Sequence, residues 1–454
     1  MAEKTLEEYG YKQELKRSLG FWGVIVYGII FTCPMAAMEM FGFVGQYANG
    51  LDSLVYIIGV AGMIFTALSY GRCVKEWPIA GSVFSYVQRT INPHVGFIAG
   101  WLILIDYALI PALVLSLGAI FLNMLIPSIP VWLALLISIL VDTVINYVGI
   151  ELADKENMAL FVIQLAGIAA FLVTGVIYLW KGGGAGAFNL DPIFQASKFN
   201  IDFIATALSI AVVTLLGFDA MTTLAEETQR PQKLIPPGMI VTLLIIGFLF
   251  IAETYIARLI HPSIQGFDPA VGFISAIVTA TGGEPLKIYI LIAFVLSLAF
   301  GTALNSQLAA SRILYSMGRD RLIPSIFGKV HPKFKTPYVA AIFFGIVTFA
   351  IGNSIGIESL SKLVNYGAMT SYMMLNVSVF WFFFVKKGQR GFGGFFNHFL
   401  FPLIGFIIIG YVWYGFDPIT KIVGTCWLIL GIIYGAIKSK GYKVVPEALM
   451  KLEI

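Results

Sequence analysis

The chain is poor in charged residues. Asp, Glu, Lys and Arg make up only 12% of its 454 residues, about half the share that an ordinary soluble domain carries. Hydrophobic residues make up 58%, and the mean hydropathy is +0.87. Because the shortage of charge extends along the whole sequence, it excludes a soluble domain with one anchor and indicates an integral membrane protein.

Several chemical patterns are also missing. The three cysteines lie in or beside apolar runs and give no disulfide framework. The four histidines lie in loops or near the ends of apolar runs, and neither HExxH nor a nucleotide-binding loop is present. The glycine-rich stretch 182–186 lacks the Lys-Ser/Thr of a phosphate loop. We therefore expect no metal, no cofactor, no enzymatic activity and no nucleic-acid partner.

Long apolar runs dominate what is present. A membrane span needs ~20 mostly apolar residues, and the first run is too long for a signal peptide. Twelve segments qualify: 22–46, 51–74, 95–122, 130–149, 157–180, 201–225, 236–260, 286–317, 337–353, 359–385, 398–415 and 419–438. We predict an all-α integral membrane protein with 12 transmembrane helices in the cell membrane. Most of the 29 lysines and arginines fall in the same set of alternate loops, which predicts that both termini are cytoplasmic.

Two of the apolar runs are interrupted. Residues 31–42 read FTCPMAAMEMFG, in which Pro34 removes a backbone donor and Glu39 places a carboxylate at membrane depth. Residues 209–236 read SIAVVTLLGFDAMTTLAEETQRPQKLIP, with Gly217 and Asp219 inside the run. The first and sixth runs hold corresponding places in two sets of five, which is typical of an inverted-repeat transporter with its site at the breaks. Two kinked helices without such a role are the alternative.

Several stretches together resemble the amino acid–polyamine–organocation superfamily of secondary transporters. They are 65–101, 146–157 (NYVGIELADKEN), 215–240 (LLGFDAMTTLAEETQRPQKLIPPGMI), 312–337 and 365–382. The patterns PM…Glu…FG in the first run and GW…LIDY in the third resemble the bacterial putrescine importers. The resemblance implies a LeuT-like 5+5 inverted repeat with broken first and sixth helices and two additional C-terminal helices. It divides the chain into a cytoplasmic segment (1–21), two five-helix repeats (22–180 and 201–385), a pair of additional helices (397–438) and a cytoplasmic tail (439–454).

Glu39 changes what the first break can bind. Amino-acid members of the superfamily have a Gly/Ser-rich break, whose bare N–H groups hold the substrate carboxylate. Here Pro34 offers no N–H group, and Glu39 would repel a carboxylate and attract an ammonium group. We therefore predict an amine without a carboxyl group, although the putrescine importers more often have Asp at this place. The alternative is that Glu39 reaches water or pairs with a neighbouring span.

Further site residues are expected around the two breaks and on the third, eighth and tenth runs. Asp106 would hold a second amine or a coupling cation, or else be a buried acid bonded to another helix. Phe218 would provide an aromatic wall for an ammonium group. Asp219 would face the site or, as the alternative, have a structural role at the break. Asp142 and Glu253 are expected to be structural. The remaining candidates are Pro34, Met35, Met38, Tyr107, Gly217, Asn305 and Tyr366.

Charged residues at the cytoplasmic ends of spans are candidates for gates. Glu226 and Glu227 follow the sixth run and Arg319 follows the eighth. They would form latch ion pairs, or else be solvated loop charges of little energetic weight. Asn365, near the outer end of the tenth run, is a candidate for the outer gate.

These expectations describe a secondary transporter that imports a small primary amine by alternating access. A monocation moving inward gains about 2.3 kcal/mol per 100 mV of membrane potential, so no further coupling ion is required. Proton coupling through Glu39 is an option. Sodium coupling through Thr302, Asn305 and Ser306 of the eighth run has less support, because small polar residues are ordinary in membrane helices. The alternatives are a monoamine or amino-acid transporter and, outside this class, a channel or a membrane enzyme.

Overall fold

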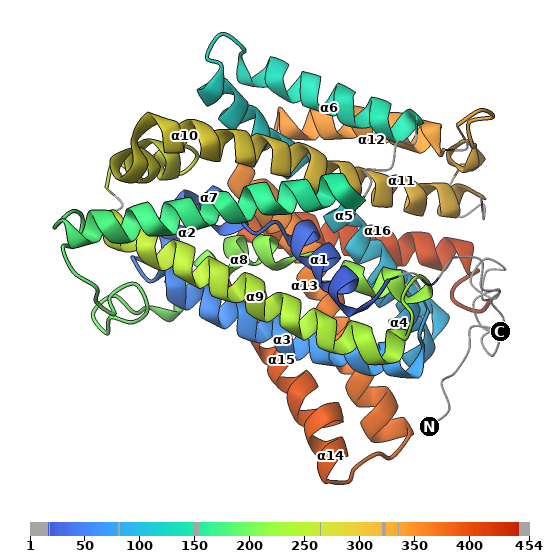
Figure 1. The fold of residues 1–454 in the computed structure, drawn as a ribbon. Helices are drawn as coiled ribbons and strands as arrows, with labels where there is room; N and C mark the ends of the chain where they lie inside the picture. The colour runs from blue at the N-terminus through green and yellow to red at the C-terminus, as the bar shows by residue number, and fades with distance from the viewer. Residues whose placement is uncertain are drawn as a thin grey trace.

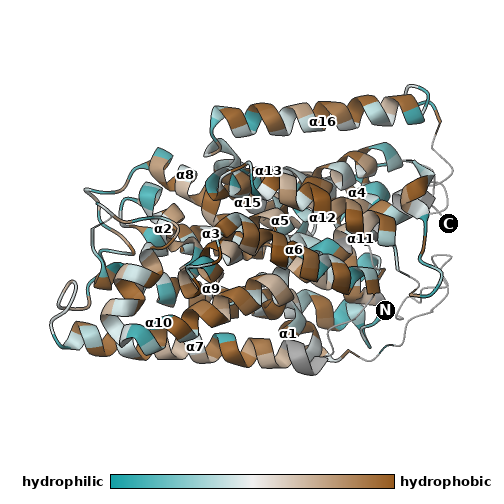
Figure 2. Ribbon diagram, turned by 90° about the horizontal axis from the view of Figure 1, so that it is seen from above, coloured by the Kyte–Doolittle hydropathy of each residue, from teal (hydrophilic) through white to brown (hydrophobic). Residues whose placement is uncertain are grey.

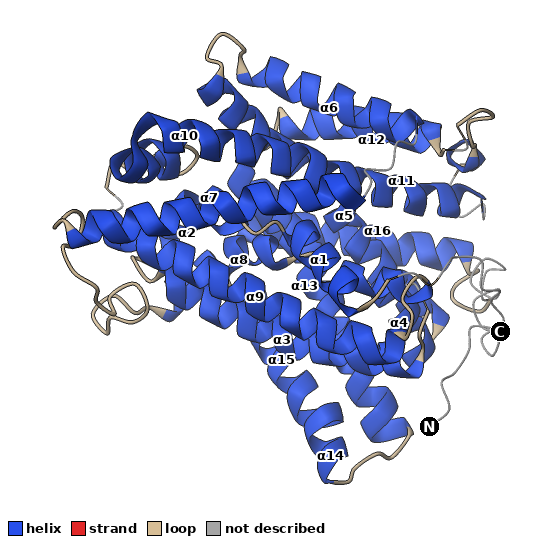
Figure 3. Ribbon diagram, viewed as in Figure 1, coloured by secondary structure: helices blue, strands red, loops and turns tan. Residues whose placement is uncertain are grey.

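The computed structural model describes residues 17, 19–79, 82–148, 154–263, 265–319, 324–334 and 336–444. All the regular elements in these ranges are helices (Figure 3). The α-helices are α1 (Phe21–Thr32), α2 (Ala36–Ala48), α3 (Asp52–Glu76), α4 (Ser82–Thr90), α5 (Pro93–Leu125), α6 (Val131–Val148), α7 (Asp154–Trp180), α8 (Ile201–Ala211), α9 (Pro231–Ile260), α10 (Thr279–Leu296), α11 (Leu304–Arg319), α12 (Tyr338–Gly352), α13 (Ile357–Val379), α14 (Phe392–Phe395), α15 (Phe401–Tyr414) and α16 (Pro418–Lys438). Shorter 3₁₀ and π segments are η2 (Val212–Leu215), η3 (Asp219–Glu226), η4 (Phe273–Val278), η5 (Ser297–Ala303), η6 (Ser325–Gly328), η7 (Phe380–Lys386) and η8 (Phe396–Leu400).

The helices are long and apolar enough for a multi-pass membrane protein. Within the described ranges, 10 of them could cross a membrane, or up to 11 if the bent pair of α1 and α2 forms one span. α12 is also apolar but has only 15 residues, about 22 Å of helix against a hydrocarbon core of ~30 Å. The all-helical membrane architecture is confirmed, whereas the number of 12 spans and the division into two repeats remain predictions.

The predicted eighth span begins earlier than expected. The structure has one apolar segment from Phe273 to Leu308, built from η4, α10, η5 and the start of α11. Gly283 kinks it, with φ +65, and Pro285 follows. The predicted span starts at residue 286, after Gly283 and Pro285, two residue types that usually interrupt secondary structure. Here the chain is helical on both sides of the kink.

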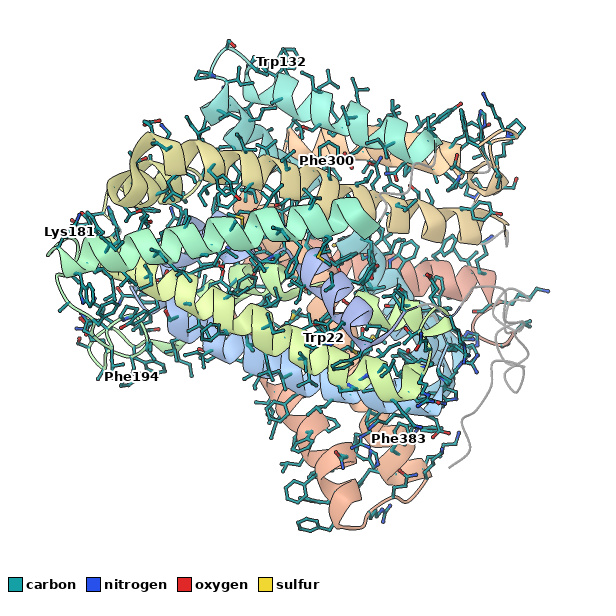
Figure 4. The ribbon with its side chains drawn as sticks, viewed as in Figure 1. Trp22, Trp132, Lys181, Phe194, Phe300 and Phe383 are labelled. Atoms are coloured by element: carbon teal, nitrogen blue, oxygen red, sulfur yellow. The ribbon has the colours of Figure 1, made fainter. Side chains whose placement is uncertain are left out.

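The outer surface of the bundle is apolar. Figure 2 shows hydrophobic residues along the helices, with α16 at one edge of the bundle. Large apolar side chains are exposed on α6, α7, α15 and α16, among them Leu140, Val162, Ile407 and Ile429. Trp22 and Trp132 are exposed near helix ends (Figure 4), the place that tryptophan favours at a membrane–water interface. This surface suits contact with lipid.

The interior is held by close contacts between long helices. α3 and α9 lie side by side (Figure 1), where Tyr56 meets Phe250 edge-on with ring centroids 5.5 Å apart. On α13, Gly367 lies so near α5 that an added Cβ would come within 2.5 Å of a main-chain oxygen. Between α5 and α16, Trp101 and Trp427 stack, and each indole N–H donates to the other's backbone carbonyl at 2.9 Å.

Candidate functional site

The first interrupted run is two helices that meet at an angle. α1 ends at Thr32, α2 begins at Ala36, and their axes differ by 42°. Cys33 has a φ of +59, a left-handed value uncommon for a residue with a side chain. Pro34 follows, and its missing N–H group prevents a continuous helical ladder. The break therefore lies where the sequence predicts it.

The second interrupted run is broken at Gly217. α8 passes into the 3₁₀ turn η2, the chain turns at Gly217 with φ +105, and η3 follows from Asp219. A Cβ on Gly217 would come within 2.3 Å of Cδ1 of Phe31 on α1. Only glycine combines this backbone conformation with this close approach. The two breaks are thus in direct contact.

A cavity of about 50 Å³ lies between the two breaks, α5 and η5. Glu39 of α2 lines it together with four smaller polar residues: Thr32, Cys33, Thr214 and Thr302. The remaining wall is apolar: Phe31, Ala36, Met40, Ile110, Leu113, Val114, Leu117, Val213, Leu216 and Leu298. The cavity therefore has one acidic group and a largely aliphatic lining.

Glu39 is 4% exposed and forms no ion pair with a described lysine or arginine. Its side-chain hydrogen-bond partner among the described residues is Cys33, whose Sγ lies 3.9 Å from Oε1. The same thiol lies 3.4 Å from Oε1 of Gln164 on α7. A carboxylate at this depth without a cation is costly, so the geometry offers Glu39 to a cation that enters the cavity.

A second acidic cluster lies near the cavity. Asp106 is one helical turn before Ile110 on α5, and its charge interacts with that of Asp219. Around Asp219, the rings of Tyr70, Phe218 and Tyr372 pack with centroids 5.7–6.0 Å apart. Two buried polar atoms in this cluster have no hydrogen-bond partner among the described residues: Oδ1 of Asp106 and the hydroxyl of Tyr70. Tyr107 belongs to the same cluster through its interaction with both aspartates.

Several predicted site residues lie outside the cavity lining. Met35 and Met38 are buried beside the first break, whereas Met40 lines the cavity. The amide of Asn305 donates to the carbonyl of Gly301 at 2.6 Å. Tyr366 faces the C-terminal helices, where its hydroxyl lies 3.1 Å from that of Thr425.

The gate candidates have mixed outcomes. The amide of Asn365 donates to the carbonyls of Ser209 and Ile210, which ties α13 to α8. The side chains of Glu226 and Arg319 lie outside the described residues. Glu227 acts through its main chain: Leu19 donates to its carbonyl at 3.0 Å, and Gln229 donates back to Leu19 at 3.0 Å. This pair of bonds ties the chain before α1 to the end of η3.

Sequence reasoning missed part of the cavity. In the sequence analysis, Cys33 is one of three cysteines without a disulfide framework, and Thr302 is a candidate sodium ligand. Thr214 is not among the predicted site residues. A signal existed for Cys33, because it directly precedes the breaking proline. The hydroxyl of Thr302 is buried without a described partner, but threonine is too common in membrane helices to be singled out.

Comparison with known proteins places the chain in a family. The amino acid permease family model matches residues 44–386, which is more than half of the chain. The low-affinity putrescine importer PlaP of Escherichia coli (strain K12) is 30% identical over 433 residues, 95% of each chain. The branched-chain amino acid permease BcaP of Bacillus subtilis (strain 168) is 27% identical over 391 residues, 81% of each chain. The methylthioribose transporter of the same organism is 24% identical over 399 residues, 83% of each chain. The chain therefore belongs to the amino acid permease family, within the amino acid–polyamine–organocation superfamily of membrane transporters.

Proposed function

We propose that the protein is a secondary transporter that imports a small primary amine, with putrescine or a related polyamine as substrate. The observation that carries this proposal is Glu39, a buried carboxylate on the cavity wall without a described cation partner. An ammonium group would neutralise it at a favourable distance. A zwitterionic amino acid would bring a carboxylate to a site where Pro34 has removed a donor. The likeness to a putrescine importer supports the same choice.

Transport would proceed by alternating access in a 5+5 inverted repeat, with the amine bound between the two breaks. The cavity of about 50 Å³ is far smaller than the ~300 Å³ of an ordinary ligand pocket. A four-carbon diamine therefore requires α1, α2 and the η2–η3 region to move away from α5. The close approach of Gly217 to Phe31 supports a joint movement of the two breaks.

A monoamine is the second candidate substrate, and the apolar wall favours it. Ile110, Leu113 and Leu117 face the same space as Glu39. An alkyl tail would gain about 0.8 kcal/mol per buried methylene on this surface. A diamine would instead need a second polar group for its far end.

Counterflow in proteoliposomes tests the proposal. The panel contains putrescine, longer polyamines, alkyl monoamines and zwitterionic amino acids. We expect amines to exchange and Glu39→Gln to lose most of that exchange, whereas the exposed control Glu284→Gln keeps it. Exchange of amino acids with unchanged activity of Glu39→Gln would overturn the proposal. The ratio of diamine to monoamine exchange decides between the two amine classes.

A further inference from the structure

The hairpin that joins α13 to α15 projects from the bundle (Figure 1). It consists of η7, α14 and η8 with the turn between them, residues 380–400, and phenylalanine is its commonest residue. Two of these rings face outward, because Phe392 is 85% exposed and Phe395 is 40% exposed. Neighbouring exposed rings of this kind mark a surface that meets a membrane or another apolar partner. The hairpin therefore offers an apolar surface at one end of the bundle.

The length of α13 and η7 places the base of this hairpin at the level of the lipid headgroups. The two segments form one apolar helix of 30 residues, from Ile357 to Lys386. Such a helix is about 45 Å long, whereas the hydrocarbon core is ~30 Å thick. Glu358 and Lys362 lie near the other end, so both ends of the helix reach beyond the hydrocarbon. The distribution of lysine and arginine predicts that the Lys386 end is cytoplasmic.

Five cations gather at the base of the hairpin and form what we call the basic surface: Arg72 and Lys75 of α3 and Lys386, Lys387 and Arg390 of the hairpin. The ion pair of Lys387 with Glu76, 3.0 Å long, joins the hairpin to the end of α3. Next to it, the rings of Trp77 and Phe382 lie 5.0 Å apart. The charge of Arg72 interacts with Lys75 and with His398 of η8. The five cations therefore belong to one surface.

Four cations of the basic surface have no carboxylate partner among the described residues: Arg72, Lys75, Lys386 and Arg390. The ammonium group of Lys386 lies 5.7 Å from the ring centroid of Phe382. The guanidinium group of Arg390 lies 5.6 Å from the ring centroid of Phe384, and its Nε donates to the carbonyl of that residue at 3.3 Å. These contacts hold the cations against aromatic rings without neutralising them. The positive charge remains available to an anion.

The ligand that fits this end of the bundle is both anionic and apolar. A small soluble anion would satisfy the cations but leave the rings of Phe392 and Phe395 exposed. An anionic phospholipid has a phosphate for the cations and acyl chains for the rings, and it is present where the base of the hairpin meets the membrane. Clustered lysines and arginines at a membrane surface attract such headgroups. The combination of unpaired cations with exposed phenylalanines therefore favours a lipid.

We propose that the basic surface and the hairpin bind an anionic phospholipid. The unpaired cations hold its phosphate, and its acyl chains lie against the exposed phenylalanines. The bound lipid links α3 to the hairpin at the headgroup level. Deeper in the bundle, Asn376 of α13 already links these elements, because it accepts a hydrogen bond from Ser69 at 2.6 Å and donates one to Thr66 at 3.2 Å. The inference does not depend on which substrate the protein transports.

The experiment measures lipid binding to the purified full chain in detergent by native mass spectrometry. Phosphatidylglycerol and phosphatidylcholine with identical acyl chains are titrated separately, and we expect the wild type to bind phosphatidylglycerol more tightly. The double variant Lys386→Gln with Arg390→Gln removes two unpaired cations. Each cation near an anionic headgroup contributes about fivefold in affinity. Phosphatidylglycerol should therefore bind this variant roughly 25-fold more weakly, whereas the affinity for phosphatidylcholine should not change.

The double variant Lys440→Gln with Lys443→Gln is the matched control. Both lysines are exposed and follow α16, so this variant loses the same charge from the same end of the bundle, but away from the hairpin. We expect it to keep the lipid preference of the wild type. Phe392→Ser with Phe395→Ser tests the acyl contacts, and it should weaken the binding of both lipids by a similar factor.

Three outcomes would overturn the inference. The wild type could bind the two lipids equally, or the two lysine and arginine double variants could weaken phosphatidylglycerol binding equally, which would mean that the overall charge attracts the lipid. Glycerol phosphate could also displace phosphatidylglycerol at an equal concentration, which would mean that the acyl chains add nothing and that the site takes a soluble anion. The proposed function stands in each case, because its own test is counterflow.

The melting temperature of the wild type covers the case in which a variant does not fold. Phosphatidylglycerol should raise this temperature more than phosphatidylcholine does. Salt screens the attraction, because the Debye length falls from about 10 Å at 0.1 M to about 3 Å at 1 M. The difference between the two lipids should therefore shrink over this range of sodium chloride. A difference that stayed constant would contradict binding of the headgroup by cations.

Discussion

The guanidinium group of Arg258 donates two hydrogen bonds to the carboxylate of Asp52. Nε donates to Oδ2 at 2.6 Å, and Nη2 donates to Oδ1 at 3.0 Å. The side chains are 4% and 0% exposed, and the guanidinium group also lies 5.0 Å from the ring centroid of Phe41. The ion pair thus joins α3, α9 and α2 near one end of the bundle.

Breaking this ion pair from one side should be severe. Arg258→Met leaves Asp52 buried without its cation, which typically costs about 3–5 kcal/mol. We expect a clearly lower melting temperature in detergent. The double variant Asp52→Asn with Arg258→Met should recover part of that loss. Lys287→Met removes the partner of the exposed Glu284 and should change stability by less than about 1 kcal/mol. Equal losses in the buried and exposed pairs would contradict this account.

Gly217→Ala should abolish transport. The new methyl group would collide with the ring of Phe31, and the φ of +105 is strained for alanine. We expect a loss of stability of about 2 kcal/mol or more and no measurable exchange. Gly410→Ala on α15 is the control, because nothing lies within 4 Å of its added Cβ. If Gly217→Ala exchanged substrate normally, the close approach of Gly217 to Phe31 would not be needed for transport.

Thr302→Val should weaken amine binding with little effect on stability. Thr302 lines the cavity, and its buried hydroxyl has no partner among the described residues, so it could accept a hydrogen bond from an ammonium group once the cavity widens. Its loss should lower affinity about tenfold, or about 1.4 kcal/mol. Thr348→Val removes a similarly unpartnered buried hydroxyl on α12 and should leave affinity unchanged. Isothermal titration measures both, and equal effects would refute a role for Thr302 in the site.

Cys33 should report the charge of the cavity. It is the cysteine that lines the cavity, whereas Cys73 is buried elsewhere and Cys426 is exposed. In a variant without the other two cysteines, a cationic thiol reagent should label Cys33 faster than an anionic one of similar size, because Glu39 attracts the cation. Glu39→Gln should remove this preference, and putrescine should slow labelling. A preference that persists in Glu39→Gln would place the attracting charge elsewhere.

Asp417 should add a small pH dependence to stability. Burial opposes ionisation, but hydrogen bonds from Thr420 and the Lys362 ammonium outweigh it and lower the pKa of Asp417. A lowered folded-state pKa stabilises the protein above the unfolded value of ~3.9, and that contribution is lost as the pH falls through the folded value. The melting temperature should therefore fall less steeply from neutral to acidic pH in Asp417→Asn than in the wild type. If the melting temperatures of the wild type and Asp417→Asn changed with pH in parallel, Thr420 and Lys362 would not stabilise the ionised Asp417.

The sequence predicted the parts of the fold that depend on local chemistry. Pro34 and Gly217 mark the two breaks because one lacks a donor and the other tolerates a positive φ. The long apolar runs marked the helices because every backbone group in hydrocarbon must be satisfied internally. The position of Glu39 on the cavity wall follows from its place one turn after the first break.

The sequence could not predict which side of a helix faces the cavity. A membrane helix is apolar on all sides, so its hydrophobic pattern carries little information about rotation. Tyr366 was expected in the site but packs against the ring of Phe416, whereas Thr214, which no sequence pattern singles out, lines the cavity. Both positions depend on the packing of several helices, which one sequence does not specify.

Among the described residues, the hydrogen bonds that link Leu19 to the end of η3 are main-chain bonds. Their strength is therefore nearly independent of the side chains at these positions, and residues there could vary in evolution without loosening this link between the two broken spans. Proline is the exception, because it would remove the donor at Leu19 or at Gln229. These hydrogen bonds can thus be kept while the cavity residues change to suit a different substrate.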